Sequence, residues 1–220
     1  MDGRTTVVGI TDKSVAGPPA FVESGHMFPA VLPADVAAEV EAFVVEVLAT
    51  VGLRHGLSHA EVMVTPAGPR LVELNPRQGG GYIFDLVHLV TGTHPLRLLV
   101  DLALGDDPCV GTVACPAPGA AVPGGSAAVV FVMAPREGTV VAADGLAAVA
   151  SDPRVVRSVL PLPAAAGRPV DNEAYLGHVV TVDPGGAGAR AHAAALVGGL
   201  RLRMAGGDTV APVGVPSGLR

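Results

Sequence analysis

Four polar side chains have the spacing expected of one face of a two-stranded hairpin: His59, Glu61, Glu73 and Asn75. Residues 58–65 and 69–75 are strand-like, and the Pro-Ala-Gly segment 66–68 between them has residue types typical of a turn. If Thr65 lies opposite Pro69, the two glutamates face each other across the hairpin, as do the histidine and the asparagine. Since strand side chains alternate between faces, all four share one face.

Two carboxylates directly opposite each other destabilise a sheet, so the pairing of Glu61 with Glu73 needs a chemical reason. Either one carboxyl is protonated or a cation lies between them. The second alternative suits Asn75, whose amide oxygen is a hard ligand like the carboxylates. Mg²⁺ held together with substrate phosphates prefers such oxygen ligands, and we predict it here with Mn²⁺ as an alternative.

The residues that follow the hairpin have properties suited to an anion. Arg77 lies two residues after Asn75, returns to the same face and can pair with phosphoryl oxygens. Three glycines allow a close approach of ligand to backbone, and the helix predicted after them would direct its first amides at an anion. These glycines are Gly79, Gly80 and Gly81.

Two other interpretations of the hairpin remain open. Glu61 and Glu73 are simply exposed surface residues if they bind nothing, and a register slip of one residue would separate them. A carboxylate-and-histidine hydrolase is a weaker alternative because the chain has no His-x-His or His-Glu-x-x-His motif.

Composition limits the class of protein. The chain has 220 residues, enough for one or two domains with a real core, and 50% of them are hydrophobic. A net charge of −6 and scattered basic residues argue against nucleic acid binding. No apolar stretch reaches the roughly 18 residues of a membrane span. Cys109 and Cys115 form neither a disulfide framework nor a closed zinc site, and no signal peptide is present, so we expect a cytoplasmic protein.

The pattern of elements predicts an α+β protein in which an antiparallel sheet is packed with helices. An apolar stripe from Val36 to Val51 predicts a helix over 35–51. A Pro/Gly-rich stretch at 106–125 is the best candidate for a boundary, which gives domains of 1–110 and 111–204 and a flexible tail, 205–220. The remaining predicted strands are 5–11, 127–133, 139–142, 155–160 and 177–182, and the remaining predicted helices are 82–90, 95–104, 146–150 and 189–204.

The hairpin and its surroundings resemble a known family. Residues 58–63 and 68–77, together with the three glycines, resemble the C-terminal part of the ATP-grasp domain. The nearest branch is the carboxylate–amine ligases that make dipeptides, the L-amino-acid ligases. The segments similar to that branch are 8–13, 21–30, 131–139 and 176–180.

The resemblance implies an enzyme that activates a carboxylate with ATP as co-substrate, forms an acyl phosphate and lets an amine attack it. It implies that Glu61, Glu73 and Asn75 bind Mg²⁺ and that Arg77 stabilises the transferring phosphoryl group. It further implies that His26 and Gly79–Gly81 line the site for an amino acid or another small carboxylate.

The same resemblance implies that part of the nucleotide site lies elsewhere. Such ligases also have an N-terminal Rossmann-like domain and an ATP-grasp N-lobe that supplies lysines, whereas this chain has 13 Arg and the single lysine Lys13. We therefore expect a C-terminal portion that is incomplete alone, with a separate chain as one source of the missing lobes. The alternative is a non-catalytic partner or regulatory module with an ATP-grasp-like fold.

Overall fold

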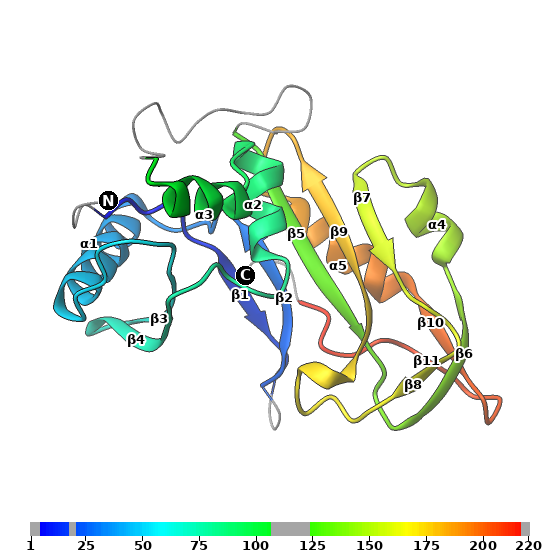
Figure 1. Ribbon diagram of the computed structural model, residues 1–220. Helices are drawn as coiled ribbons and strands as arrows, with labels where there is room; N and C mark the ends of the chain where they lie inside the picture. The colour runs from blue at the N-terminus through cyan, green and yellow to red at the C-terminus, as the bar shows by residue number, and fades with distance from the viewer. Residues whose placement is uncertain (1–4, 18–20, 107–123, 217–220) are drawn as a thin grey trace. The chain divides into compact units, whose positions relative to one another are not determined.

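The computed structural model describes residues 5–17, 21–106 and 124–216, and Figure 1 shows their elements. The chain divides into two compact units. Unit 1 consists of Met1–Ile10 and Pro29–Ala121, and unit 2 consists of Thr11–Phe28 and Val122–Arg220. In the described ranges, none of the helices combines the length and apolar character needed to cross a membrane.

The described part of unit 1 contains three helices, and all three agree with the sequence prediction. They are α1 (Ala34–Thr50), α2 (Ile83–Thr91) and α3 (Pro95–Leu104). Helices α2 and α3 end at Gly92 and Gly105, whose φ angles of 73° and 87° are left-handed. Glycine reaches this conformation without a Cβ clash, so these two positions stop the helices.

The remaining elements of unit 1 form the predicted hairpin, made of β3 (His59–Thr65) and β4 (Gly68–Asn75). The strands are antiparallel, and α1 packs against both of them. The hairpin forms a two-stranded sheet of its own. Helix α1 therefore supports the hairpin that carries Glu61 and Glu73.

Unit 2 contains an antiparallel five-stranded sheet in the order β1-β2-β5-β9-β7 (Figure 1). The central strand β5 is buried along all eight of its residues, and β2 and β9 pair with its two edges. This sheet confirms the predicted α+β class with antiparallel strands. The bounds are β1 Asp12–Val15, β2 Glu23–Phe28, β5 Ser126–Met133, β7 Val155–Val159 and β9 Tyr175–Asp183.

One face of this sheet is covered by α5 (Ala189–Gly199), which packs on β5 and β9. The core between them contains Val130, Val179 and Val197, each at most 3% exposed. A second antiparallel sheet and the short helix α4 (Leu146–Ser151) complete unit 2. Its strands are β6 (Gly138–Asp144), β8 (Ala164–Ala166), β10 (Arg201–Met204) and β11 (Thr209–Val210).

The structure corrects two predicted elements. Residues 5–11 form no strand, because β1 at Asp12–Val15 is the segment that pairs with β2. The helix predicted over 189–204 ends at Gly199, and residues 201–204 form β10. Two glycines weaken the helix at that point, and the alternation of buried Leu202 and Met204 with exposed arginines favours a strand.

The predicted domain limits differ from the units in two places. Strands β1 and β2 lie in unit 2, although their sequence precedes most of unit 1. In the predicted flexible tail, β11 pairs with β10, and Val213 bridges to Met133. Most of the predicted boundary at 106–125, including Cys109 and Cys115, lies outside the described residues.

Candidate active site

The hairpin of unit 1 brings the two predicted carboxylates together. Glu61 pairs directly with Glu73, and His59 pairs with Asn75, as the sequence predicted. The turn itself differs from the prediction, because Thr65 pairs with Gly68 and the loop has two residues instead of three. A register shift after Glu61 compensates by placing an extra residue in β4. The shorter turn and the bulge thus cancel, and the carboxylates stay aligned.

The side chains of His59 and Asn75 lie beside this carboxylate pair. The Nε2 atom of His59 lies 3.6 Å from Oε1 of Glu61, within the range of an ion pair when the imidazole is protonated. In the part of the chain that the structure describes, the amide Nδ2 of Asn75 is buried without a hydrogen-bond partner. Because amide nitrogen and oxygen are assigned from their partners, rotation of this amide would present Oδ1 instead.

The donor set fits Mg²⁺ on chemical grounds. Glu61 and Glu73 offer two carboxylates on one face, and the amide of Asn75, whose Nδ2 has no hydrogen-bond partner among the described residues, would offer a third oxygen after rotation. No group of three His, Cys, Asp or Glu side chains that could hold a metal occurs within residues 5–17, 21–106 and 124–216. A metal here would therefore rely on the amide, on water and on phosphate, as Mg²⁺ commonly does.

Arg77 and the three glycines follow β4 directly. Arg77 is exposed, and its Nη1 donates a hydrogen bond of 3.0 Å to the carbonyl oxygen of Gln78. A Cβ added at Gly79 would lie 3.0 Å from the side chain of Ile83, whereas one added at Gly80 would meet no atom within 4 Å. The backbone at Gly80 is therefore open to a ligand, while a side chain at Gly79 would crowd Ile83.

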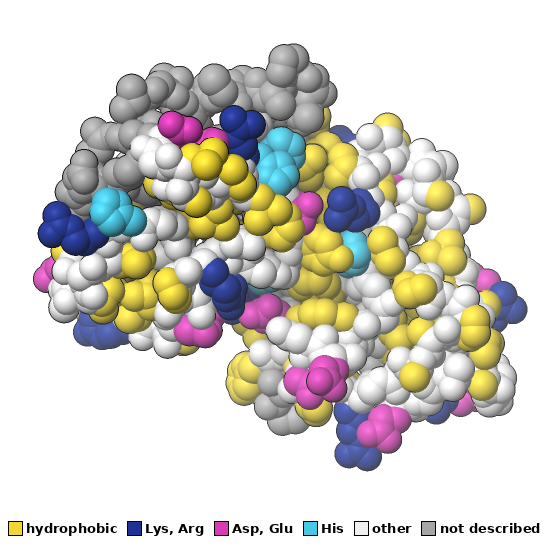
Figure 2. Space-filling model, in the orientation of Figure 1, with side chains coloured by type: hydrophobic (Ala, Val, Ile, Leu, Met, Phe, Trp, Pro, Cys, Tyr) yellow, Lys and Arg dark blue, Asp and Glu magenta, His cyan; other side chains and the backbone are white. Residues whose placement is uncertain are grey.

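The Lys and Arg side chains on the visible surface are dispersed. Figure 2 shows them scattered singly over that face and not gathered in one patch. No basic patch among the described residues of this face therefore marks a phosphate site. Near the hairpin, the basic residue that the sequence predicts to bind a phosphate is Arg77.

A second polar cluster lies in unit 2, on strands β1 and β2. The ammonium of Lys13 donates a hydrogen bond of 2.6 Å to Oε1 of Glu23. The Nε2 atom of His26 lies 3.6 Å from Oε2 of the same carboxylate, a charge contact longer than a hydrogen bond. His26 is the substrate-site histidine that the sequence predicted, and it lies in the other unit from the hairpin.

The cluster contains a carboxylate with a lowered pKa, Glu23, and a buried histidine, His26. His26 and then Lys13 favour the carboxylate of Glu23 and lower its pKa from 4.5 to about 2, against burial, which raises it. His26 is 1% exposed, and neither ring nitrogen finds a hydrogen-bond partner among the described residues. A buried imidazole whose nitrogens make no hydrogen bond to the described residues needs an explanation, and a substrate group that it binds is a direct one.

Sequence reasoning missed Glu23 and Lys13. Alternation along a regular strand would place Glu23 and His26 on opposite faces. The structure shows an extra residue, Ser24, at a register shift, where Ser14 pairs with Gly25 and Val15 with Glu23. This bulge turns the carboxylate towards the face of His26. A signal that could have found this cluster is Lys13, the single lysine of the chain.

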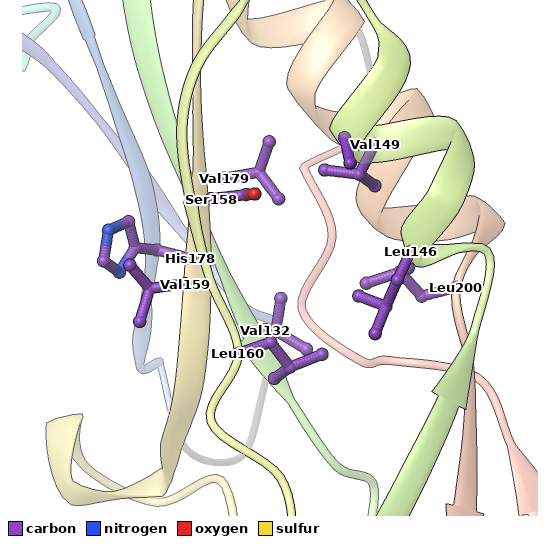
Figure 3. A pocket seen from close by; sticks show the side chains of 10 residues that line it. Val132, Leu146, Val149, Ser158, Val159, Leu160, His178, Val179 and Leu200 are labelled. Carbon is purple, nitrogen blue, oxygen red and sulfur yellow. The ribbon is translucent and has the colours of Figure 1, made fainter.

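Unit 2 also contains an apolar pocket, whose lining differs from the polar residues of this cluster. It has a volume of about 230 Å³ and is lined mainly by aliphatic side chains. Figure 3 shows the ring of His178 beside Val159, apart from the group formed by Leu146, Val149 and Leu200. The pocket lacks the paired carboxylates and cations of the other two sites, so we do not assign the chemistry to it.

Two family models match successive parts of the chain. An ATP-grasp domain model matches residues 1–85, which include the hairpin and the His26 cluster. A model described as L-amino acid ligase C-terminal domain 2 matches residues 130–205, which include β5, β9 and α5.

Curated relatives match about half of the chain. Carnosine synthase 1 of Gallus gallus is 38% identical over 108 residues, which are 49% of this chain and 12% of that protein. Carnosine synthase 1 of Homo sapiens is 31% identical over 110 residues, which are 50% of this chain and 13% of that protein. The matches therefore span only a small part of these longer enzymes.

Solved structures show the same fold. The L-amino acid ligase from Bacillus licheniformis has a TM-score of 0.73 at 22% identity, covering 92% of this chain and 49% of that one. Phosphoribosylglycinamide synthetase from Anaerococcus prevotii has a TM-score of 0.64 at 13% identity, covering 79% and 43%. The chain spans about half the length of these two proteins. The chain is thus similar to an ATP-grasp domain in its N-terminal part and to L-amino acid ligase C-terminal domain 2 in its C-terminal part.

Proposed function

We propose that the chain supplies the acidic, metal-binding part of an ATP-dependent carboxylate–amine ligase that acts through an acyl phosphate. The observation that supports this most is the direct pairing of Glu61 with Glu73 on one hairpin face, next to the unpartnered amide of Asn75. The names of the relatives, L-amino acid ligase and carnosine synthase, favour an amino acid or another small carboxylate as substrate.

In this proposal Glu61, Glu73 and Asn75 hold Mg²⁺, or Mn²⁺ in its place. The bound ion would neutralise charge on the phosphate oxygens of ATP. The two carboxylates would fix the position of the ion, and the ion in turn would orient the phosphates. This matters because phosphoryl transfer depends chiefly on positioning and electrostatic stabilisation. The antiparallel pairing, supported by α1, keeps the two side chains at a constant separation.

Arg77 and the glycine segment are assigned to the reacting groups. The guanidinium of Arg77 is exposed and has further N–H donors beyond the one bonded to Gln78, so it can bind a phosphoryl oxygen bidentately. Gly79, Gly80 and Gly81 line the amino-acid site, and the space at Gly80 lets a substrate approach the backbone.

His26 is assigned to the amino-acid substrate as well. Its buried ring, whose nitrogens make no hydrogen bond within the described part of the chain and which lies beside a carboxylate that stays ionised, can donate to or accept from a polar substrate group. The lysine-bearing lobe of the nucleotide site would come from sequence outside these 220 residues, either in the same polypeptide or in a separate chain. This is consistent with the 49% of the L-amino acid ligase that the chain covers.

Calorimetric titration with a nucleotide tests this function. The chain is titrated with ADP in Mg²⁺ and in EDTA, and the same is done for Glu73→Ala and for a control, Glu46→Ala, which removes an exposed carboxylate of α1. We expect Mg²⁺-dependent binding in the native chain and in the control, and its loss in Glu73→Ala. Binding that ignores Mg²⁺ in all three proteins would contradict the metal site and favour a non-catalytic module.

A further inference from the structure

A tyrosine from the C-terminal part of unit 2 contacts the polar cluster of β2. The hydroxyl of Tyr175, in β9, lies 2.9 Å from the backbone carbonyl oxygen of Glu23 and 2.8 Å from Oδ1 of Asn172. Burial raises the pKa of this phenol, as does the nearby charge of Glu23, so the hydroxyl keeps its proton and remains a donor. The contact joins segments that are 152 residues apart in the sequence.

The hydroxyl acts at an irregular point of the sheet. The β1–β2 ladder shifts register where Ser14 pairs with Gly25 and Val15 with Glu23, so regular pairing is interrupted at the residue that bears the carboxylate. A hydrogen bond to the carbonyl oxygen of Glu23 fixes the main chain at that position. It therefore also fixes the direction in which the carboxylate leaves the strand.

The ring of Tyr175 reaches the histidine through a second aromatic ring. Tyr175 and Phe131 are stacked, with centroids 4.1 Å apart and planes 8° from parallel. Phe131 in turn meets His26 edge-on, at 5.9 Å and 85°. Both arrangements are favourable for aromatic pairs. The three rings come from β9, β5 and β2, which are neighbours in the sheet.

We propose that Tyr175 is a positioning residue that sets the geometry of the Glu23–His26 pair, through its hydroxyl for Glu23 and through Phe131 for His26. The domain matched by the L-amino acid ligase C-terminal model would then define the alignment of side chains that lie in the ATP-grasp match. The inference rests on the proposed role of His26 at the substrate site. The titratable groups of the cluster are Lys13 from β1 and Glu23 and His26 from β2, and the phenol of Tyr175, from β9, contacts the backbone carbonyl oxygen of Glu23.

The test is an NMR titration of the full chain. The carboxyl ¹³C signal of Glu23 and the ring signals of His26 are followed downward from neutral pH in the native protein and in Tyr175→Phe, which keeps the stacked ring but removes the hydroxyl. We expect the pKa of Glu23 to rise from about 2 towards 4.5. A rise of about one unit corresponds to the net contribution of one hydrogen bond.

Two further variants separate positioning from general destabilisation. Asn172→Ala removes the other partner of the hydroxyl and should leave the titration of Glu23 unchanged. Phe131→Leu keeps the hydroxyl and should change the ring signals of His26. The proposal is overturned if Tyr175→Phe leaves Glu23 as in the native chain, or if Asn172→Ala shifts it equally. Since no substrate enters this readout, failure to bind an amino acid would remove the proposed role of His26 without changing the titration of Glu23, so the two failures are distinguishable.

Discussion

At the scale of single residues, Glu23 should make the free energy of unfolding depend on pH in the acidic range. Its native pKa of about 2 lies below the ordinary 4.5, so its pairing stabilises the fold above pH 4.5. That contribution is lost as the pH falls from 4.5 towards 2. Urea unfolding of the native chain and of Glu23→Gln should therefore show a difference in unfolding free energy that is constant above pH 4.5 and shrinks below it.

A matched control for this experiment is Glu137→Gln. Glu137 pairs with Arg168 at 3.1 Å, but both side chains are largely exposed, and such pairs contribute little. Its free energy of unfolding should stay within about 0.5 kcal/mol of the native value. A difference for Glu23→Gln that does not change with pH would show that the carboxylate is not held by its partners.

The facing carboxylates predict an opposite effect at the hairpin. Without metal, Glu73→Gln removes a like-charge contact with Glu61 and should raise the unfolding free energy by about 0.5 kcal/mol. With Mg²⁺ the native chain should gain stability and the variant should gain less, because one of the proposed metal ligands is gone. Thermal unfolding in EDTA and in Mg²⁺ measures both effects. A variant that is less stable than the native chain in EDTA would contradict the repulsion.

The two sites differ in how far the sequence predicts them. Glu61 and Glu73 were predicted to pair because alternation holds along most of the hairpin, and the one-residue error in the turn is cancelled by the bulge. The partnership of Glu23 with His26 was not predictable, because it depends on the extra residue Ser24 at another bulge. Bulges arise from how two strands meet, and this information is absent from either strand alone.

At the scale of elements, the β3–β4 turn depends on a single glycine. Gly68 has φ +91°, a conformation that costs an L-residue about 1–2 kcal/mol. A Cβ there would also lie 2.9 Å from Oε1 of Glu39, although that side chain is flexible and can move. We therefore expect Gly68→Ala to lower the unfolding free energy by about 1 kcal/mol, measured by urea unfolding.

Gly167→Ala is the matched control for the turn, because its Cβ would meet no atom within 4 Å and its φ is not left-handed. This variant should be as stable as the native chain or more stable, by up to about 1 kcal/mol. Equal stability of the two variants would show that the turn tolerates a side chain and that the hairpin is not held by Gly68.

Elements with a clear period were predicted well, and elements defined by their neighbours were not. The apolar stripe of α1 and the terminal glycines of α2 and α3 are local signals, and these helices match closely. Strand β2 contains the buried polar residues Ser24 and His26, so it lacks an alternating pattern and was not assigned. Residues 201–204 were included in a predicted helix, but in the structure they form β10, which pairs with β6.

At the scale of the whole molecule, unit 2 is assembled from two distant segments. Strands β1 and β2 complete the sheet whose centre is the fully buried β5. A fragment of residues 122–220 would expose the edge of β5 that β2 covers. We expect this fragment to aggregate or stay unfolded, and addition of residues 11–28 through a linker to restore a dispersed NMR spectrum. A well-dispersed spectrum of the 122–220 fragment alone would contradict this.

The most direct test of the central claim is to locate a divalent ion on the hairpin. Substoichiometric Mn²⁺, added to ¹⁵N-labelled chain, broadens the amide signals that lie near the bound ion. We expect broadening at Glu61, Glu73 and Asn75, its loss in Glu73→Gln and its persistence in Glu46→Gln. Broadening that is absent from the hairpin, or that survives in Glu73→Gln, would contradict the assignment of these residues as the metal site.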